Sequence, residues 1–182
     1  WDKLLDADFC CMADSGCGKT WSRMGMCAAA SPTALIRLIF DFAYFKGEFM
    51  ETQFDHYISK KMKDYEDNGK INRPDYRTDW TRCTFAELYQ HLGVELKLGA
   101  VDMHTKEFVF LCKDFCPDMP ISLGVRASSA IPIVFRPVKW KGNVQGSERE
   151  LYLCDGGMLS NLPISAFSSD EAERILACDL LS

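Results

Sequence analysis

The stretch Leu151–Pro163, which reads L-Y-L-C-D-G-G-M-L-S-N-L-P, decides the fold and organises the rest of the chain. Four largely apolar, β-favouring residues lead directly into Asp155, and two glycines follow. This pattern predicts a buried strand that ends in a tight turn, with Asp155 at its mouth. Gly156 and Gly157 permit positive φ and leave the space beside the carboxylate free of Cβ atoms, so a backbone or a ligand can approach closely. The same residues also fit an ordinary hairpin turn.

Length and composition indicate one globular domain over residues 1–182. The chain is 47% hydrophobic, which is enough for a substantial core, and its net charge is −5. We expect no nucleic-acid partner, because neutralising phosphates requires clustered Lys and Arg. The nine cysteines are odd in number and lie mainly in apolar runs, which favours reduced thiols in a cytoplasmic compartment. There is no signal peptide and no apolar run of about 18 residues, so we expect no membrane-spanning segment. The abrupt start near a buried strand suggests a fragment of a longer domain.

The N-terminal region predicts a strand, a sharp turn and a helix. Residues 9–12 are apolar, residues 13–20 read A-D-S-G-C-G-K-T, and residues 21–30 are typical of a helix. One interpretation is a loose phosphate-binding P-loop, in which Lys19 contacts phosphate oxygens and Thr20 contacts magnesium. That interpretation also needs a carboxylate at the end of an apolar strand, for which Asp179 is the candidate.

The other interpretation of the same turn is a relaxed nucleophile elbow that exposes Ser15. In this interpretation Ala13 and Cys17 replace the two flanking glycines of the elbow, whose small size lets the helix pack against the strand. A serine hydroxyl needs a base to become a nucleophile, and a carboxylate partly withdrawn from water can act as that base. The pattern therefore pairs Ser15 with Asp155.

The middle of the chain alternates between helix and strand signals. We expect helices over residues 51–65, from a capping box at 84–87 onwards, and over 119–129. Strands are expected over 95–102 and 107–111. A buried proline loop over 130–138 should lie beneath the site, and a polar loop should follow over 139–150. Lys60, Lys61 and Lys63 lie on the polar face of the first helix, which faces solvent or an anionic membrane.

No metal site is expected. Cys112 and Cys116 have no second pair of ligands at zinc spacing, and His56, His91 and His104 show neither metal nor triad spacing. These histidines are interpreted as surface or structural residues, and the sequence indicates no cofactor.

Three motifs in this order resemble the patatin-like phospholipase family: T-F-A-E-L at 84–88, V-R-A-S-S-A-I-P at 125–132 and D-G-G-x-x-x-N-L-P at 155–163. The resemblance covers roughly residues 8–181. It implies an α/β fold, a three-layer α/β/α sandwich, and hydrolysis of acyl esters of phospholipids and neutral lipids by a Ser-Asp dyad. It also implies that Asp155 is the dyad aspartate, and that the first strand and the glycine-rich oxyanion loop of the family precede this chain.

The nucleophile of the family lies in G-x-S-x-G, and residues 13–18 depart from that pattern in either register. If Ser15 aligns with the nucleophile, both flanking glycines are replaced; if Gly18 aligns with the last glycine, Gly16 stands at the nucleophile position. We favour Ser15, because its neighbours are small and the Gly16 N–H can serve an oxyanion. Cys17 is a weaker candidate, since Lys19 would then occupy a position that must be small.

The resemblance predicts a serine esterase of the phospholipase A type. Ser15 is the nucleophile, Asp155 is the base, and Gly16 with the backbone of Gly156 and Gly157 forms the oxyanion site. The expected partner is a phospholipid or another acyl-ester lipid, met at a transient membrane surface. Two alternatives stay open: a catalytically silent member of the family that binds lipid or protein, and the P-loop protein.

Overall fold

The computed structural model describes residues 43–167 except residues 73, 75 and 76. Several predicted elements and sites lie outside the described residues: the N-terminal strand, turn and helix, Ser15, Gly16, Cys17, Lys19, Thr20 and Asp179. The description below therefore concerns the part of the chain that contains Asp155.

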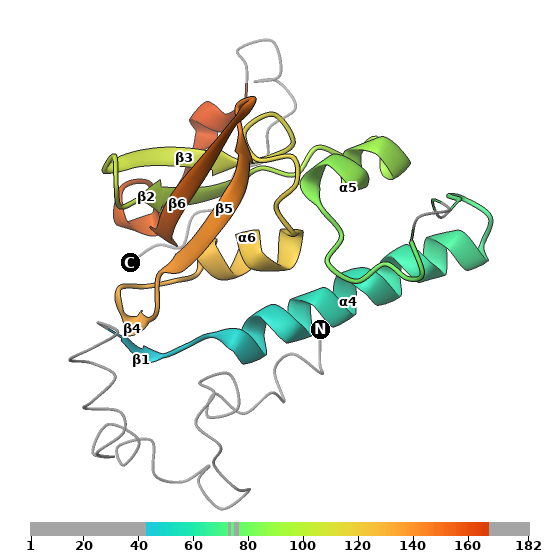
Figure 1. Cartoon of the computed structure of the whole chain (residues 1–182), viewed down its shortest axis with the longest axis horizontal. Coiled ribbons are helices and arrows are strands. Elements are labelled where there is room, and N and C mark those ends of the chain that lie inside the picture. The colour runs from blue at the N-terminus through green and yellow to red at the C-terminus, as the bar shows by residue number, and fades with distance from the viewer. Residues whose placement is uncertain (1–42, 73, 75–76, 168–182) are drawn as a thin grey trace, which may run out of the picture.

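A four-stranded antiparallel sheet forms the centre of the described fold (Figure 1). Its order is β3-β2-β6-β5, and its strands are β2 (Leu98–Asp102), β3 (Glu107–Leu111), β5 (Val138–Val144) and β6 (Ser147–Asp155). A second, parallel pair joins β1 (Ala43–Phe45) to β4 (Ile133–Phe135). The chain is thus a mixed α/β protein with an open sheet, as the sequence predicted at the level of class.

Strand β6 is held differently at its two ends. Residues 147–153 of β6 pair with β5, whereas its last three residues, 153–155, pair with β2, where Ala100 lies opposite Asp155. Leu153 is therefore the residue of β6 that is paired on both sides. Asp155 lies beyond the pairing with β5 and has β2 as its strand neighbour.

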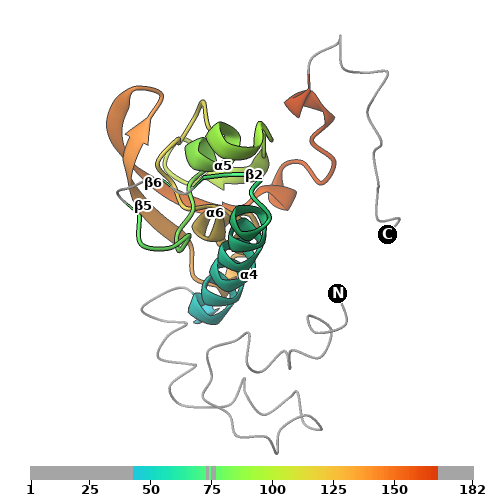
Figure 2. The same ribbon diagram turned by 90° about the vertical axis from the view of Figure 1, so that its right-hand side faces the viewer.

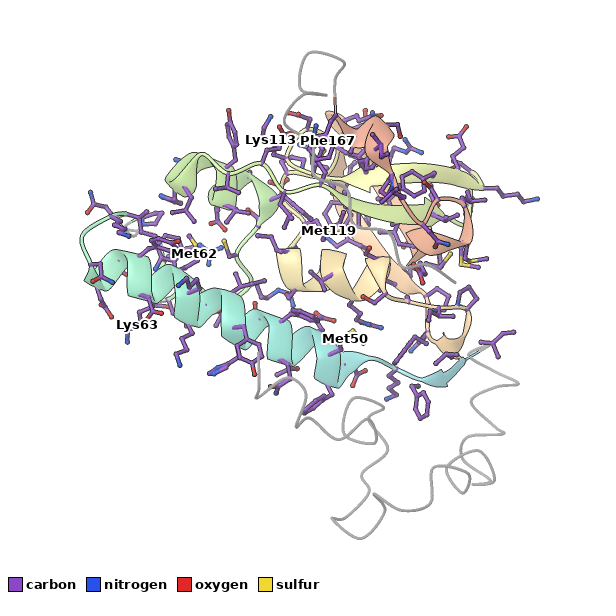
Figure 3. The ribbon with its side chains drawn as sticks, turned by 180° about the vertical axis from the view of Figure 1, so that it is seen from behind. Met50, Met62, Lys63, Lys113, Met119 and Phe167 are labelled. Atoms are coloured by element: carbon purple, nitrogen blue, oxygen red, sulfur yellow. The ribbon has the colours of Figure 1, made fainter. Side chains whose placement is uncertain are left out.

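The helices of the described fold are α4 (Glu48–Asp67), α5 (Phe85–Leu92) and α6 (Ile121–Ser128). Helix α6 contacts β2, β5 and β6 on one side and α4 on the other, as Figure 1 shows. In Figure 3, Met62 points from α4 towards α5, while its neighbour Lys63 points away from the fold. The core combines apolar side chains from every layer: Met62, Trp80, Phe85, Leu111, Met119, Val138, Leu151 and Leu153. No helix of the described residues is both long and apolar enough to span a bilayer.

Several elements confirm the sequence predictions. The helix expected over residues 51–65 is α4, and the strands expected over 95–102 and 107–111 are β2 and β3. Thr84 and Glu87 form the expected capping box at the start of α5. Helix α6 begins after Pro120 and ends at Ser128. Capping residues and apolar periodicity were sufficient here, because these elements are stabilised by their own local patterns.

The prediction of a polar loop over residues 139–150 is wrong. These residues form β5 and the first half of β6, a hairpin that turns at Gln145 and Gly146, both at positive φ. Its outer face carries cross-strand ion pairs from Lys139 to Glu150 (2.9 Å) and from Lys141 to Glu148 (3.1 Å). Residues 138–141 read V-K-W-K and do alternate, but residues 142–150 read G-N-V-Q-G-S-E-R-E, in which Val144 is the one apolar side chain, so the strand signal fades on both sides of the turn.

The proline segment over residues 130–138 is only partly buried. Ala130 is buried, but the side chains of Ile131 and Ile133 are 49% and 61% exposed. The segment also contains β4 and the first residue of β5, so it is not a simple loop. The expectation of a wholly buried loop is therefore wrong, although the Ala130 end does lie against the site.

A partly buried ion pair fixes the loop before α5. Arg77 Nε donates to Glu87 Oε1 at 2.6 Å and Arg77 Nη2 to Glu87 Oε2 at 2.5 Å. Burial alone raises the pKa of Glu87, but the hydrogen bonds from Arg77 and from Thr84 outweigh it and hold that pKa below its ordinary value of 4.5. A carboxyl group whose pKa is lowered in the folded state stabilises that state above its unfolded pKa, and this contribution is lost as the pH falls through the folded value.

Replacing Glu87 with Gln should lower the free energy of unfolding at pH 7 by about 3 kcal/mol, because it removes the negative charge that accepts two hydrogen bonds from the largely buried Arg77 guanidinium. Chemical denaturation measures this loss, and the E87Q variant should also lose less stability than the parent between pH 5 and pH 3. Glu148→Gln is the matched control: its partner Lys141 is exposed, so the expected change is about 0 to 1 kcal/mol. Equal losses in the two variants would contradict the assignment.

Candidate active site

The site is built around Asp155, the last residue of β6. Leu153 and Cys154 are buried, Asp155 is half-buried, and the chain turns at once into a 3-10 helix, η2 (Gly156–Met158). The predicted buried strand that ends at Asp155 is confirmed. The alternative of a hairpin turn is excluded, because β6 pairs with β2 and β5, both of which precede it in the chain.

The backbone of Asp155 is tied to the segment that follows α6. Its N–H donates to the Ala130 carbonyl at 3.0 Å, and Ala130 is 1% exposed. Helix α6 ends two residues earlier, and Ala130 itself donates its N–H to Ala127 in that helix. The R-A-S-S-A-I-P motif and the D-G-G motif therefore meet through one backbone hydrogen bond.

Gly156 lets the turn lie directly against β2. A Cβ atom at this position would stand 2.6 Å from both the carbonyl carbon and the carbonyl oxygen of Gly99, which is closer than any real contact. Gly156 and Gly157 are not among the glycines at positive φ, so the turn does not use the positive φ that these residues permit. What Gly156 supplies is the other property expected of it, the room for a close backbone approach.

Gly157 orients the carboxylate. Its N–H donates to Asp155 Oδ1 at 2.8 Å, and the Asn161 Oδ1 atom lies 2.8 Å from where a Gly157 Cβ would stand. Among the described residues, Asp155 Oδ2 has no hydrogen-bond partner. One carboxylate oxygen is thus held and the other is available as an acceptor.

Neither cysteine nor histidine competes for the catalytic role within the described residues. The Cys154 thiol is buried, and burial, together with the nearby charges of Asp155 and Asp102, raises its pKa. Burial likewise raises the pKa of Cys83 and that of Cys116 to about 12. These thiols therefore stay protonated at neutral pH and are poor nucleophiles.

The three histidines all lie among the described residues, and none hydrogen-bonds to Asp155. His91 packs edge-on against Trp80, His104 stacks on Tyr152, and His56 lies on α4 beside Tyr57. The prediction that they are surface or structural residues fits these contacts. No histidine of the described residues is therefore positioned as a hydrogen-bond partner of the Asp155 carboxylate.

One cluster outside the site brings potential metal ligands together. The ligand atoms of Glu95, Cys112 and Asp114 lie within 4.8 Å of one another. Lys113 pairs with Asp114 at 2.7 Å and Lys97 with Glu95 at 3.7 Å, so lysines already balance both carboxylates. We assign no metal to this cluster.

Two residues of the site received no role from the sequence. Ala130 acts through its carbonyl, which no side-chain pattern reveals, and Asn161 lies inside the quoted motif but was given no function. The D-G-G-x-x-x-N spacing was the available signal for Asn161, since it brings the Asn161 side chain back beside Gly157.

The two cavities described lie away from the site. One of about 460 Å³ is lined by residues of β3, and one of about 480 Å³ is lined by residues of α4; Asp155 lines neither.

Comparison with known proteins gives the family. The family model for patatin-like phospholipases matches residues 24–168, a range that includes α6, Ala130 and the complete D-G-G motif. The chain belongs to the patatin-like phospholipase family. Asp155 lies within the range matched by the patatin-like model, whereas Ser15 precedes it.

A relative in Bacillus subtilis (strain 168) has a similar sequence. The uncharacterized protein YqhO is 33% identical over 120 residues, which cover 58% of this chain and 40% of that protein. This patatin-like chain thus spans less than half the length of the curated relative that it matches.

The substitution Gly156→Ala should destabilise the protein by about 1–3 kcal/mol, because the new methyl group meets the Gly99 backbone and must push β6 away from β2. Thermal unfolding measures the loss. Gly157→Ala is the control, since its methyl group meets the movable end of the Asn161 side chain. We expect it to cost clearly less stability, and a G157A variant as unstable as G156A would contradict the packing argument.

Proposed function

We propose that this protein is a lipid acyl hydrolase in which Ser15 is the nucleophile and Asp155 is the general base. The observation that carries the proposal is the state of the Asp155 carboxylate: Oδ1 is held by the Gly157 N–H, and Oδ2 has no partner among the described residues. A carboxylate that is oriented through one oxygen and open at the other can accept the proton of an incoming hydroxyl. Family membership supports an ester of a lipid as the substrate.

The reaction would proceed in two steps. Asp155 Oδ2 takes the proton from the Ser15 hydroxyl as its oxygen attacks the ester carbonyl carbon, and the alcohol leaves with that proton while Ser15 carries the acyl group. Water then attacks the acyl-enzyme, Asp155 accepts one of its protons, and the fatty acid is released as Ser15 regains its proton. The Gly16 N–H is the proposed donor to the developing oxyanion, and losing such a donor typically costs about 10² to 10³ in rate.

The sequence analysis also offered the backbone of Gly156 and Gly157 for the oxyanion site. The Gly157 N–H donates to Asp155 itself, so its contribution in this arrangement is to orient the base. Gly156 contributes the close packing against Gly99. The oxyanion role therefore rests mainly on Gly16, and we propose the three-layer sandwich of the family as the framework that brings Gly16 and Ser15 to Asp155.

A second function, a catalytically silent domain that binds lipid or protein, has one observation in its favour. The family match begins at residue 24, so it includes Asp155 and gives no support to the role of Ser15 as nucleophile. The P-loop alternative loses its basis with family membership, because a patatin-like domain requires no nucleotide site.

Asp155→Asn should lower the rate of hydrolysis of a soluble short-chain p-nitrophenyl ester by about 10² to 10⁴, since an amide cannot accept the serine proton. Asp114→Asn is the control: the Asp114 side chain is 71% exposed and lies outside the site, so its rate should equal that of the parent. A D155N variant that keeps the parental rate would refute the role of Asp155 as base.

A fluorophosphonate probe tests the nucleophile separately. Labelling of the parent that disappears in Ser15→Ala supports the hydrolase. Labelling that persists in S15A would show that another residue is the nucleophile, and no labelling of the parent would favour the silent domain.

A further inference from the structure

Exposed apolar side chains are concentrated in the two chain segments that the hydrogen bond between Asp155 and Ala130 joins. The described residues expose ten large hydrophobic side chains, and seven of these lie in two short segments, residues 131–133 and 158–167. We name five of them the apolar rim: Ile131 (49% exposed), Ile133 (61%), Met158 (58%), Leu159 (59%) and Leu162 (37%). Single exposed apolar residues are normal on a protein surface, but a group of them marks an interaction site.

The hydrogen bond between Asp155 and Ala130 brings the two segments together. We call residues 131–133 and 158–167 the two arms of the rim. Ile131 follows Ala130 directly and Met158 follows Asp155 by three residues, so both arms begin close to the hydrogen bond of 3.0 Å between the Asp155 N–H and the Ala130 carbonyl oxygen. In Figure 1, β4 and the first orange-red turn lie at the same left-hand side of the molecule. Figure 2 shows the orange-red turns standing clear of β5 and β6.

Both arms of the rim lack charge. Residues 127–135 read A-S-S-A-I-P-I-V-F and residues 156–169 read G-G-M-L-S-N-L-P-I-S-A-F-S-S, with no charged residue in either, although 26% of the chain is charged. One cation contacts the end of the second segment: Lys97, whose Nζ donates to the Ala166 carbonyl and lies 5.8 Å from the centre of the Phe167 ring. In Figure 3, Phe167 lies at the edge of the fold. Such a surface favours an uncharged apolar environment rather than an ionic partner.

The basic face of α4, which the sequence offered for an anionic membrane, is less suited to that role. Lys60 and Lys63 line a cavity together with the carboxylates of Glu66, Asp67 and Asp79. Positive and negative charges alternate there, so attraction to an anionic surface is largely cancelled. Electrostatic binding through α4 is thus not the mode that the structure favours.

We propose that the apolar rim inserts into a neutral lipid interface and so carries Asp155 to the substrate. The inference rests on the proposed function, because the substrate of a lipid acyl hydrolase lies in such an interface and the catalytic base must reach it. The occupant is a zwitterionic phosphatidylcholine surface, bound through apolar area and insensitive to salt.

Vesicle flotation of the full chain with phosphatidylcholine tests the surface. The double variant Ile131→Ser, Leu159→Ser should bind about 10-fold to 30-fold more weakly than the parent, since two half-exposed side chains lose most of their apolar area. Val94→Ser with Met103→Ser is the matched control, with side chains 53% and 47% exposed outside the rim, and it should bind like the parent. Equal binding by the two double variants, or parental binding that falls steeply with salt, would overturn the proposal.

A tryptophan at the rim tests whether another part of the chain covers it. The emission of Leu159→Trp, taken as the difference from the parent, should be that of an exposed indole in buffer and should shift to shorter wavelength with vesicles. An emission already shifted in buffer would show that the chain itself covers Leu159, and would overturn the proposal.

Hydrolysis of the soluble p-nitrophenyl ester separates this inference from the proposed function. The I131S/L159S variant should keep the parental rate on that ester and lose it only on vesicles. If the parent hydrolyses no ester yet binds vesicles through the rim, the proposed hydrolase activity is refuted and the lipid-binding surface is supported. If the parent hydrolyses the soluble ester and the rim variant keeps the parental rate on vesicles, the hydrolase activity is supported and the role of the rim is refuted.

Discussion

The hydrogen bond from the Asp155 N–H to the Ala130 carbonyl is the contact on which the described site depends. It joins the end of β6, which lies in the sheet, to the segment leaving α6, which lies beneath it. Because both groups are backbone atoms in a buried region, leaving either without a partner would cost more than the bond itself contributes. The carboxylate direction and the exposed arms around it both follow from this one attachment.

Close packing makes that attachment possible. Gly156 lies against Gly99 with no room for a Cβ atom, so the turn after Asp155 stays tight against β2. The next amide then points back at the carboxylate, and the Gly157 N–H holds Oδ1. A larger residue at Gly156 would move the carboxylate, because the backbone on the other side cannot yield. Two glycines in sequence therefore serve different purposes, one for packing and one for orienting the Asp155 carboxylate.

The elements that the sequence predicted well are those with strong local signals. The capping box of Thr84 and Glu87, the apolar periodicity of α4 and the buried run into Asp155 each contain their own evidence. The β5–β6 hairpin was missed because the residues around its turn, 142–150, are polar or glycine except Val144, and the cross-strand pairs of lysine and glutamate lie in and beside this stretch. Those charges are paired only across the two strands, and a pattern read along a single strand does not reveal a partner on another.

The sequence by itself determined the mixed α/β class, the strand that ends at Asp155 and, through three motifs, the family. It did so because buried runs, caps and glycine turns are local, and motif spacing is written in the chain. Only the tertiary structure decided that Ala130 anchors Asp155, that Gly156 packs on Gly99, and that the segments carrying the exposed Ile131 and Leu159 are joined through Asp155 and Ala130. These facts depend on which distant backbones come within hydrogen-bonding or van der Waals distance, and only the packing of α6 against the sheet brings them there.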